Sequence, residues 1–116
     1  MTDPATDKHS DLDVLRDLGK TIRARKSESA QTSYTAKLLD GGISVCAKKF
    51  GEEAVETLIA AIEDDKNHLA EESADMLYHW LVMLEAADVS LADVMAVLRA
   101  RQGVGGLVEK AARTPR

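Results

Sequence analysis

The sequence predicts an all-α protein. Its apolar residues are mainly Ala, Leu and Val, and they recur at helical spacing along most of the 116 residues. Aromatic residues make up only 3% of the chain, a proportion that disfavours a β-sandwich or a β-barrel. The expected architecture is an antiparallel helical hairpin with flanking helices. Because two helices make a thin core, we expect two chains to pair as a homodimeric helical bundle.

The first two predicted helices follow a polar segment, residues 1–10, that we expect to be disordered. An apolar stripe begins after Asp11, the expected N-cap, and it comprises Leu12, Leu15, Leu18 and Ile22. Residues 23–32 are interpreted as a loop or a frayed helix end. Ser33 is expected to cap a short helix over residues 34–39, which the segment Asp40-Gly41-Gly42 ends.

Three further helices are predicted, over residues 44–63, 68–87 and 91–101. Charged residues at 63–67 form the expected turn between the first two. Ser90 is a good N-cap for the last helix, with Asp93 placed as in a capping box. The predicted domain therefore spans residues 11–102, and residues 103–116 are expected to form a mobile, glycine-rich tail.

Composition excludes several classes of function. The net charge of -5 gives no basic face for nucleic acid, so no nucleic-acid partner is expected. Neither an 18-residue apolar run nor an apolar N-terminal region is present, so we predict no membrane span and no signal peptide. The single cysteine, Cys46, is expected to be a small core residue, and it fits a reducing, cytoplasmic compartment.

Residues 44–63 carry three carboxylates on one helical face. At 100° per residue, Glu52, Glu53 and Glu56 fall with Lys48 and Lys49 in an arc of about 100°. The opposing arc is apolar and holds Ala47, Phe50, Ala54, Leu58, Ala61 and Ile62. Like charges at these spacings repel one another. The face is therefore either a solvated polar surface or one side of a cation site.

Residues 68–87 place Glu72, Asp75 and His79 on one arc of a helix whose other faces are largely apolar. That pattern is typical of a buried helix, so Asp75 is expected on a buried face. A buried carboxylate needs a partner. The alternatives are an ion pair with Lys48, Lys49 or an arginine, and a metal ion shared with the preceding helix. His79 is either an outer-sphere group near such an ion or a hydrogen-bonded core histidine.

A helical hairpin brings these two acidic faces together. Fifteen residues separate Glu56 from Glu72, enough to end one helix and begin an antiparallel one. The donors are carboxylate oxygens without cysteine, and such a set suits a hard cation. The expected cofactor is therefore Mg²⁺, with Mn²⁺ as the possible substitute.

The two acidic motifs, Glu52-Glu53-x-x-Glu56 and Glu72-x-x-Asp75, resemble the metal-binding signature of the MazG-type all-α nucleoside triphosphate pyrophosphohydrolases. Four longer segments are similar to phosphoribosyl-ATP pyrophosphatases in particular, and they comprise residues 33–39, 48–56, 71–79 and 91–99. Their order and spacing also match, and the resemblance covers about residues 12–101.

The resemblance implies hydrolysis of phosphoribosyl-ATP to phosphoribosyl-AMP and pyrophosphate, the second step of L-histidine biosynthesis, by a homodimer. A metal-activated water would attack between the α- and β-phosphates. The expected metal ligands are Glu53, Glu56, Glu72 and Asp75. Glu52, Glu53 and Glu56 are the expected catalytic residues, with Glu52 as a further ligand or a base. The expected substrate contacts are Tyr34, Lys37, Lys48, Lys49 and Arg99.

Two alternatives remain beside this interpretation. One is a house-cleaning hydrolase that acts on ordinary or damaged nucleotides with the same acidic site. The segments around Tyr34 and Tyr78-His79 favour phosphoribosyl-ATP over that reading. The other is a non-enzymatic, metal-binding dimerisation module. Carboxylates on an otherwise apolar helix argue against a pure scaffold.

Overall fold

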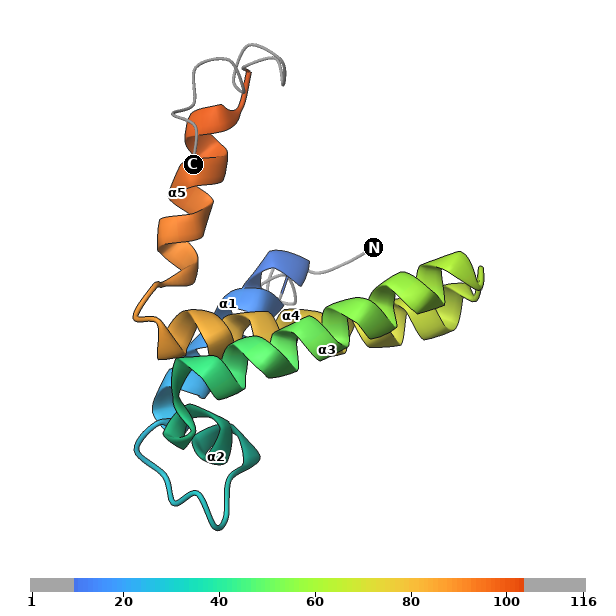
Figure 1. Ribbon diagram of the computed structural model, residues 1–116. Helices are drawn as coiled ribbons and strands as arrows, with labels where there is room; N and C mark the ends of the chain where they lie inside the picture. The colour runs from blue at the N-terminus through green and yellow to red at the C-terminus, as the bar shows by residue number, and fades with distance from the viewer. Residues whose placement is uncertain (1–9, 104–116) are drawn as a thin grey trace.

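The computed structural model describes residues 10–103, and the all-α prediction is confirmed there. The helices are α1 (Asp11–Arg25), α2 (Tyr34–Asp40), α3 (Gly42–Ile62), α4 (Lys66–Ala86) and α5 (Leu91–Arg101) (Figure 1). The predicted disordered segment and mobile tail lie outside the described residues, apart from Ser10 and Gly103. None of the described helices has both the length and the apolar character that a membrane span requires.

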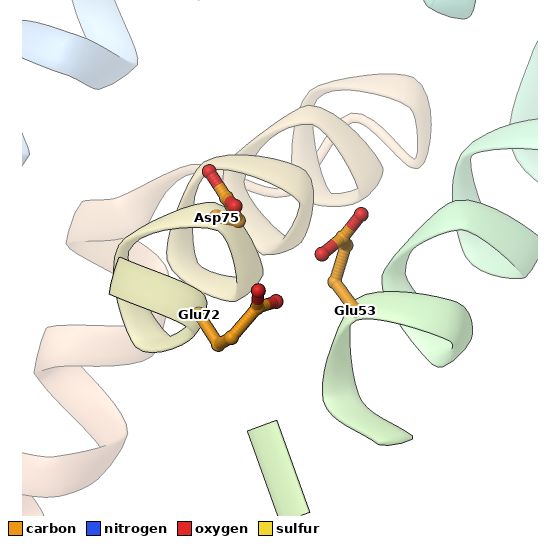
Figure 2. Close-up of side chains that lie close together, drawn as sticks. All are labelled: Glu53, Glu72 and Asp75. Atoms are coloured by element: carbon orange, nitrogen blue, oxygen red, sulfur yellow. The ribbon is translucent and has the colours of Figure 1, made fainter. Parts of the chain in front are cut away.

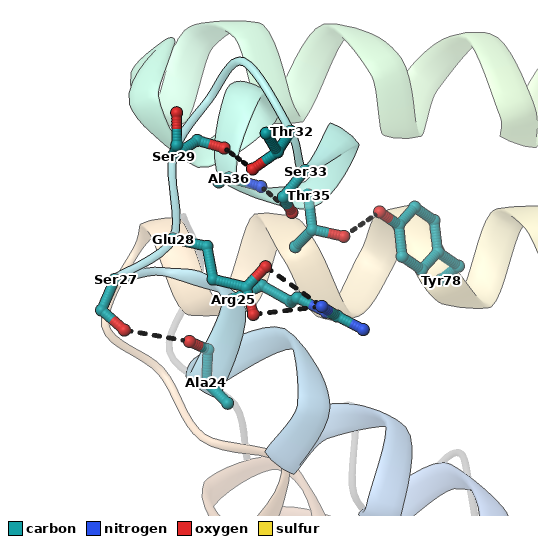
Figure 3. A network of polar contacts seen from close by, with 10 residues as sticks. All are labelled: Ala24, Arg25, Ser27, Glu28, Ser29, Thr32, Ser33, Thr35, Ala36 and Tyr78. Carbon is teal, nitrogen blue, oxygen red and sulfur yellow. Dashed lines mark hydrogen bonds and ion pairs between the residues drawn. The ribbon is translucent and has the colours of Figure 1, made fainter.

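Helix α1 begins one residue earlier and ends later than the sequence predicts. Its N-cap is Ser10, whose side chain accepts a hydrogen bond from the Asp13 amide at 3.4 Å, so the assignment of Asp11 as the cap is wrong. The helix continues to Arg25, beyond the predicted end near Ile22. Arg25 Nη1 then contacts both carboxylate oxygens of Glu28 at 3.0 Å (Figure 3). Arginine therefore closes the turn that follows α1.

The junction between α2 and α3 depends on a glycine. Ser33 caps α2 as predicted, and its Oγ accepts from the Ala36 amide at 3.1 Å. Gly42 has a φ of 85°, a left-handed conformation that disfavours side chains. This residue lets the chain turn directly into α3, which begins at Gly42 rather than at the predicted Ser44.

Helices α3 and α4 form the predicted antiparallel hairpin (Figure 1). Asp64 takes a left-handed φ of 58° in the turn, and Asp65 caps α4 by accepting from the His68 amide at 3.0 Å. Helix α4 therefore begins at Lys66, two residues before the predicted start. The Ser90–Asp93 capping box of α5 is confirmed.

The hydrophobic core lies where α1, α2 and α3 meet the C-terminal half of α4. Its buried members are Ile22, Leu38, Cys46, Leu81 and Val82. Cys46 is a core residue as expected, and its thiol donates to the Leu38 carbonyl at 3.2 Å. Hydrogen bonding between the Thr35 and Tyr78 hydroxyls joins α2 to α4 at the edge of this core (Figure 3).

The prediction that α4 is buried nearly all round is wrong for the single chain. His79, Leu81 and Val82 are its buried residues, whereas Asp75 and Leu77 are exposed. The hairpin turn projects away from α2, so the N-terminal half of α4 lies beyond the core (Figure 1). Helix α5 also stands apart from the hairpin and buries no residue. The sequence pattern shows apolar residues on most faces of α4. In the single chain, only the face with His79, Leu81 and Val82 is buried.

Candidate metal centre

Three carboxylates converge across the hairpin. One oxygen from each of Glu53, Glu72 and Asp75 lies within 4.8 Å of the other two (Figure 2). Glu53 comes from α3, and the other two side chains lie one turn apart on α4. Glu53 and Glu72 are half-buried, whereas Asp75 is exposed. The expectation of a buried Asp75 is therefore wrong, because the buried core lies further along α4, at Leu81 and Val82.

The cluster lacks a lysine or arginine partner within residues 10–103. No lysine or arginine of that range lies within ion-pair distance of these three carboxylates, and Lys49 pairs instead with Glu52 at 3.7 Å. Glu72 contacts His68 Nε2 at 3.2 Å. The ion pair considered from the sequence therefore has no counterpart among the described residues.

The donor set fits a small, hard cation. Carboxylate oxygens are the ligands that Mg²⁺ and Mn²⁺ prefer, and two carboxylates commonly suffice when phosphates supply further oxygens. Adjacent and opposite oxygens around Mg²⁺ lie roughly 3 to 4 Å apart. The chemistry of Glu53, Glu72 and Asp75 is therefore compatible with a divalent ion.

Two other predicted acidic residues lie outside the cluster. Glu52 and Glu56 are both exposed on α3, one residue before and three residues after Glu53. Glu52 contacts Lys49, as described above. Glu56 has no place in the group of converging oxygens. The structure thus brings together three of the four expected metal ligands.

The expected substrate contacts fall on three different helices. Lys49 and Lys48 lie on α3 beside the acidic residues. Tyr34 and Lys37 lie on α2, where both line an open depression together with Asp40 and residues 30–33. Arg99 lies on α5, which stands away from the hairpin (Figure 1). A single chain therefore does not bring Arg99 to the carboxylates.

His79 connects the acidic cluster to the depression beside Tyr34. Its ring meets Tyr78 edge to face at 4.9 Å and Tyr34 at 6.2 Å between centroids. The side chain is buried, but Nδ1 has no hydrogen-bond partner among the described residues. The expected hydrogen-bonded core histidine is therefore only half right. Burial lowers the pKa of His79, and Lys49 adds to the effect. The nearby carboxylates, Glu53, Asp75 and Glu52, oppose it.

Sequence reasoning missed two residues that contact the cluster. His68 lies four residues before Glu72, so helical spacing could have identified it. Thr57 carries a hydroxyl that reaches from α3 to the backbone of α4 at Glu72. Threonine within a helix gives no comparable signal, because the direction of its hydroxyl depends on a neighbour that the sequence does not reveal.

The fold and the site together define the class of protein: it is all-helical, and carboxylates from both helices of a hairpin form a candidate divalent-ion centre. Comparison with known proteins identifies the family. The family model for phosphoribosyl-ATP pyrophosphohydrolase matches residues 15–102, so the chain belongs to that family.

Curated relatives agree over most of their length. A Ruegeria sp. (strain TM1040) protein named phosphoribosyl-ATP pyrophosphatase is 58% identical over 102 residues, covering 88% of this chain and 97% of the relative. A protein of the same name from Cereibacter sphaeroides is 56% identical, covering 88% and 99% respectively. Bradyrhizobium diazoefficiens has a relative named phosphoribosyl-ATP pyrophosphatase 1, which is 54% identical over 100 residues and covers 86% and 94%.

The lowered pKa of His79 predicts a pH-dependent part of the folding stability. The unfolded state binds a proton near pH 6.5, while the folded state resists protonation until lower pH. Stability from His79 is therefore present above the unfolded pKa and is lost as the pH falls through it. His79→Gln should lose less melting temperature than wild type between about pH 7.5 and 5.5. Thermal melts in EDTA test this, and equal losses in both proteins would contradict it.

Proposed function

We propose that this protein hydrolyses phosphoribosyl-ATP to phosphoribosyl-AMP and pyrophosphate, the second step of histidine biosynthesis. Support comes from the names of relatives that it matches almost end to end. The observation that carries the proposal is the convergence of Glu53, Glu72 and Asp75 from two helices, with no lysine or arginine of residues 10–103 at ion-pair distance. Such a cluster suits a phosphate substrate only when a cation accompanies it.

We further propose Mg²⁺, or Mn²⁺ in its place, as that cation. Glu53, Glu72 and Asp75 would hold it, and Glu56 would complete the protein ligands by rotating toward the cluster from the same face of α3. A divalent ion bound there supplies positive charge to the phosphate oxygens that gain negative charge during hydrolysis. The half-buried Glu53 and Glu72 lie in a less polar setting than free solvent, which strengthens their attraction for a cation.

The remaining residues have proposed roles in holding the substrate. Glu52, exposed beside Glu53, would orient the attacking water and accept its proton. Lys49 and Lys48 would contact phosphates from the same helix. Tyr34 and Lys37 line the depression on α2 and would contact the part of the substrate away from the cleaved bond. Arg99 would reach the substrate only from a second chain.

A homodimer is the proposed assembly. Four apolar side chains at helical spacing are exposed along α3, namely Val55, Leu58, Ile59 and Ile62, with Ile62 84% exposed. The Cα radius of gyration is 16.9 Å, above the value of about 13 Å for a compact domain of roughly 100 residues. Helix α5 has no buried residue among residues 10–103, and its Val97 and Leu98 are exposed. A second copy would cover these surfaces by pairing like with like.

Substrate and metal are tested together. Purified protein with Mg²⁺ should release pyrophosphate from phosphoribosyl-ATP far faster than from ATP or dUTP. EDTA should abolish the release, and added Mg²⁺ or Mn²⁺ should restore it, because the proposed ligands are all carboxylate oxygens. Comparable turnover of the three nucleotides would favour a house-cleaning hydrolase. Full activity in metal-free buffer would contradict the metal proposal.

Asp75→Asn separates catalysis from folding. The substitution keeps the side-chain size but removes a charge from the cluster, so kcat should fall by about 10² or more. Because Asp75 is exposed, the metal-free variant should unfold within about 0.5 kcal/mol of wild type. Assays with Mg²⁺ and urea unfolding in EDTA measure the two effects.

Glu71→Gln is the matched control for Asp75→Asn, because Glu71 is an exposed carboxylate on α4 outside the cluster. This control should retain wild-type activity. A large loss of metal-free stability in Asp75→Asn, with activity retained, would instead assign Asp75 a structural role. The metal site would then have to be redrawn around α3.

The dimer is tested by placing a charge on the apolar stripe of α3. Leu58→Glu should convert a species of twice the chain mass into a monomer in sedimentation, because one buried charge would face the other across a two-fold interface. Val14→Glu, at an exposed apolar position on α1, is the control and should leave the mass unchanged. A wild-type protein that sediments as a monomer at micromolar concentration would refute the assembly.

A further inference from the structure

Thr57 contacts the backbone of both acidic helices. Its Oγ1 lies 2.8 Å from the Glu53 carbonyl oxygen and 3.1 Å from the Glu72 carbonyl oxygen. The first contact stays within α3, four residues back, and the second crosses to α4. These carbonyls belong to two of the three residues whose carboxylates converge. The hydroxyl has one proton, so the two carbonyls share it as acceptors of a three-centre hydrogen bond, which links the backbone positions from which Glu53 and Glu72 extend.

This contact is distinctive within the hairpin. Among residues 10–103, no other side-chain hydrogen bond or ion pair joins α3 to α4. The rest of their contact is packing, which is non-directional and tolerates small sliding of one helix along the other. A hydrogen bond depends on distance and angle and resists such sliding. Thr57 therefore supplies a directional restraint on the axial position of α3 relative to α4.

The bond has no evident role in satisfying backbone polar groups. A threonine hydroxyl in a helix commonly donates to the carbonyl four residues earlier, so the Glu53 contact alone would satisfy it. The Glu72 carbonyl lies within α4, where helical hydrogen bonding provides its usual donor. The contact with Glu72 is thus an addition whose main consequence is geometric.

Electrostatics make that restraint useful. Glu53 faces Glu72 and Asp75 across the hairpin, and these like charges favour separation of α3 from α4 at this level when no cation is bound. Thr57 lies one helical turn from Glu53, on the side of the hairpin turn. Its hydroxyl opposes the separation where the repulsion acts.

We propose that Thr57 is a positioning residue, whose hydroxyl holds α3 and α4 in the register that spaces Glu53 against Glu72 and Asp75 for a divalent cation. The inference rests on the proposed metal site. Thr57 acts through the backbone and touches neither the substrate nor the ion. Its loss should therefore weaken metal binding while leaving turnover at saturating metal close to wild type.

The test measures Mn²⁺ affinity by calorimetry in Thr57→Val, which keeps the shape of the side chain and removes the hydroxyl. We expect the Kd for Mn²⁺ to rise about 10-fold, as is typical when an outer-shell partner of a metal site is lost. Thr57→Ser should restore most of the affinity because it restores the hydroxyl. The Mn²⁺ concentration for half-maximal activity should shift in parallel with the Kd.

Thr35→Val is the matched control, since it removes another hydroxyl that joins two helices, α2 and α4, away from the carboxylates. It should retain wild-type Mn²⁺ affinity even if its melting temperature falls. Wild-type affinity in folded Thr57→Val, or equal weakening in Thr35→Val, would overturn the inference. Thr57→Ala replaces the valine variant if that protein fails to fold. Absence of Mn²⁺ binding to wild type would overturn the metal site itself, a result distinct from failure of Thr57 alone.

Discussion

Repulsion among three carboxylates across the α3–α4 hairpin is the constraint to which the rest of the structure responds. Glu53, Glu72 and Asp75 bring like charges within 4.8 Å without a lysine or arginine at ion-pair distance in residues 10–103. Neighbouring like charges cost free energy unless water or a cation offsets them. Folding must therefore be stabilised elsewhere in the chain, so that the cluster is held together before a ligand arrives.

That stabilisation comes from the opposite end of the hairpin. Buried residues of α1, α2 and α3 pack against Leu81 and Val82 of α4. Glu85, near the end of α4, also pairs with Arg23 and Lys26 at 3.3 Å and so fastens the end of α1. Along the two helices, the carboxylates lie nearer to the hairpin turn than the core residues Cys46, Leu81 and Val82 do. The core and the candidate site therefore occupy different parts of the α3–α4 hairpin. Near the site, the hydroxyl of Thr57 on α3 donates to the Glu72 carbonyl of α4.

The sequence predicted several features that depend on local chemistry, although the cap of α1 is Ser10 and not Asp11. Ser33 and Ser90 were identified as caps because a hydroxyl before an apolar period has a specific role in accepting from backbone amides. The converging acidic faces followed from helical spacing and a short turn. Asp75 was expected to be buried because periodicity records how many apolar residues surround a position. It does not record whether other helices cover those residues, and the buried core of α4 lies at Leu81 and Val82 rather than near Asp75.

Contacts between helices were beyond prediction for a related reason. His68 could have been found beside Glu72 by spacing alone, whereas the Thr57 contact needs the relative height and rotation of two helices. Small errors in that rotation move a hydroxyl out of hydrogen-bond range, since the interaction weakens steeply with angle. The position of Arg99 was equally beyond prediction. The sequence places Arg99 on α5, but its distance from the carboxylates depends on how α5 packs against the other helices.

The proposed dimer interface on the exposed stripe of α3 would connect assembly to the chemistry of the site. Leu58 and Ile59 lie on the same helix as Glu53, and Glu52 and Glu56 lie between the stripe and the cluster. A second chain on the stripe would exclude water from one side of these carboxylates. Their mutual repulsion and their attraction for a cation would both strengthen, because both depend on the local dielectric. Dimerisation and ion binding would then be coupled. The interface would strengthen the repulsion among Glu53, Glu72 and Asp75, and a bound cation would offset that repulsion. The interface would also increase the affinity of these carboxylates for a cation.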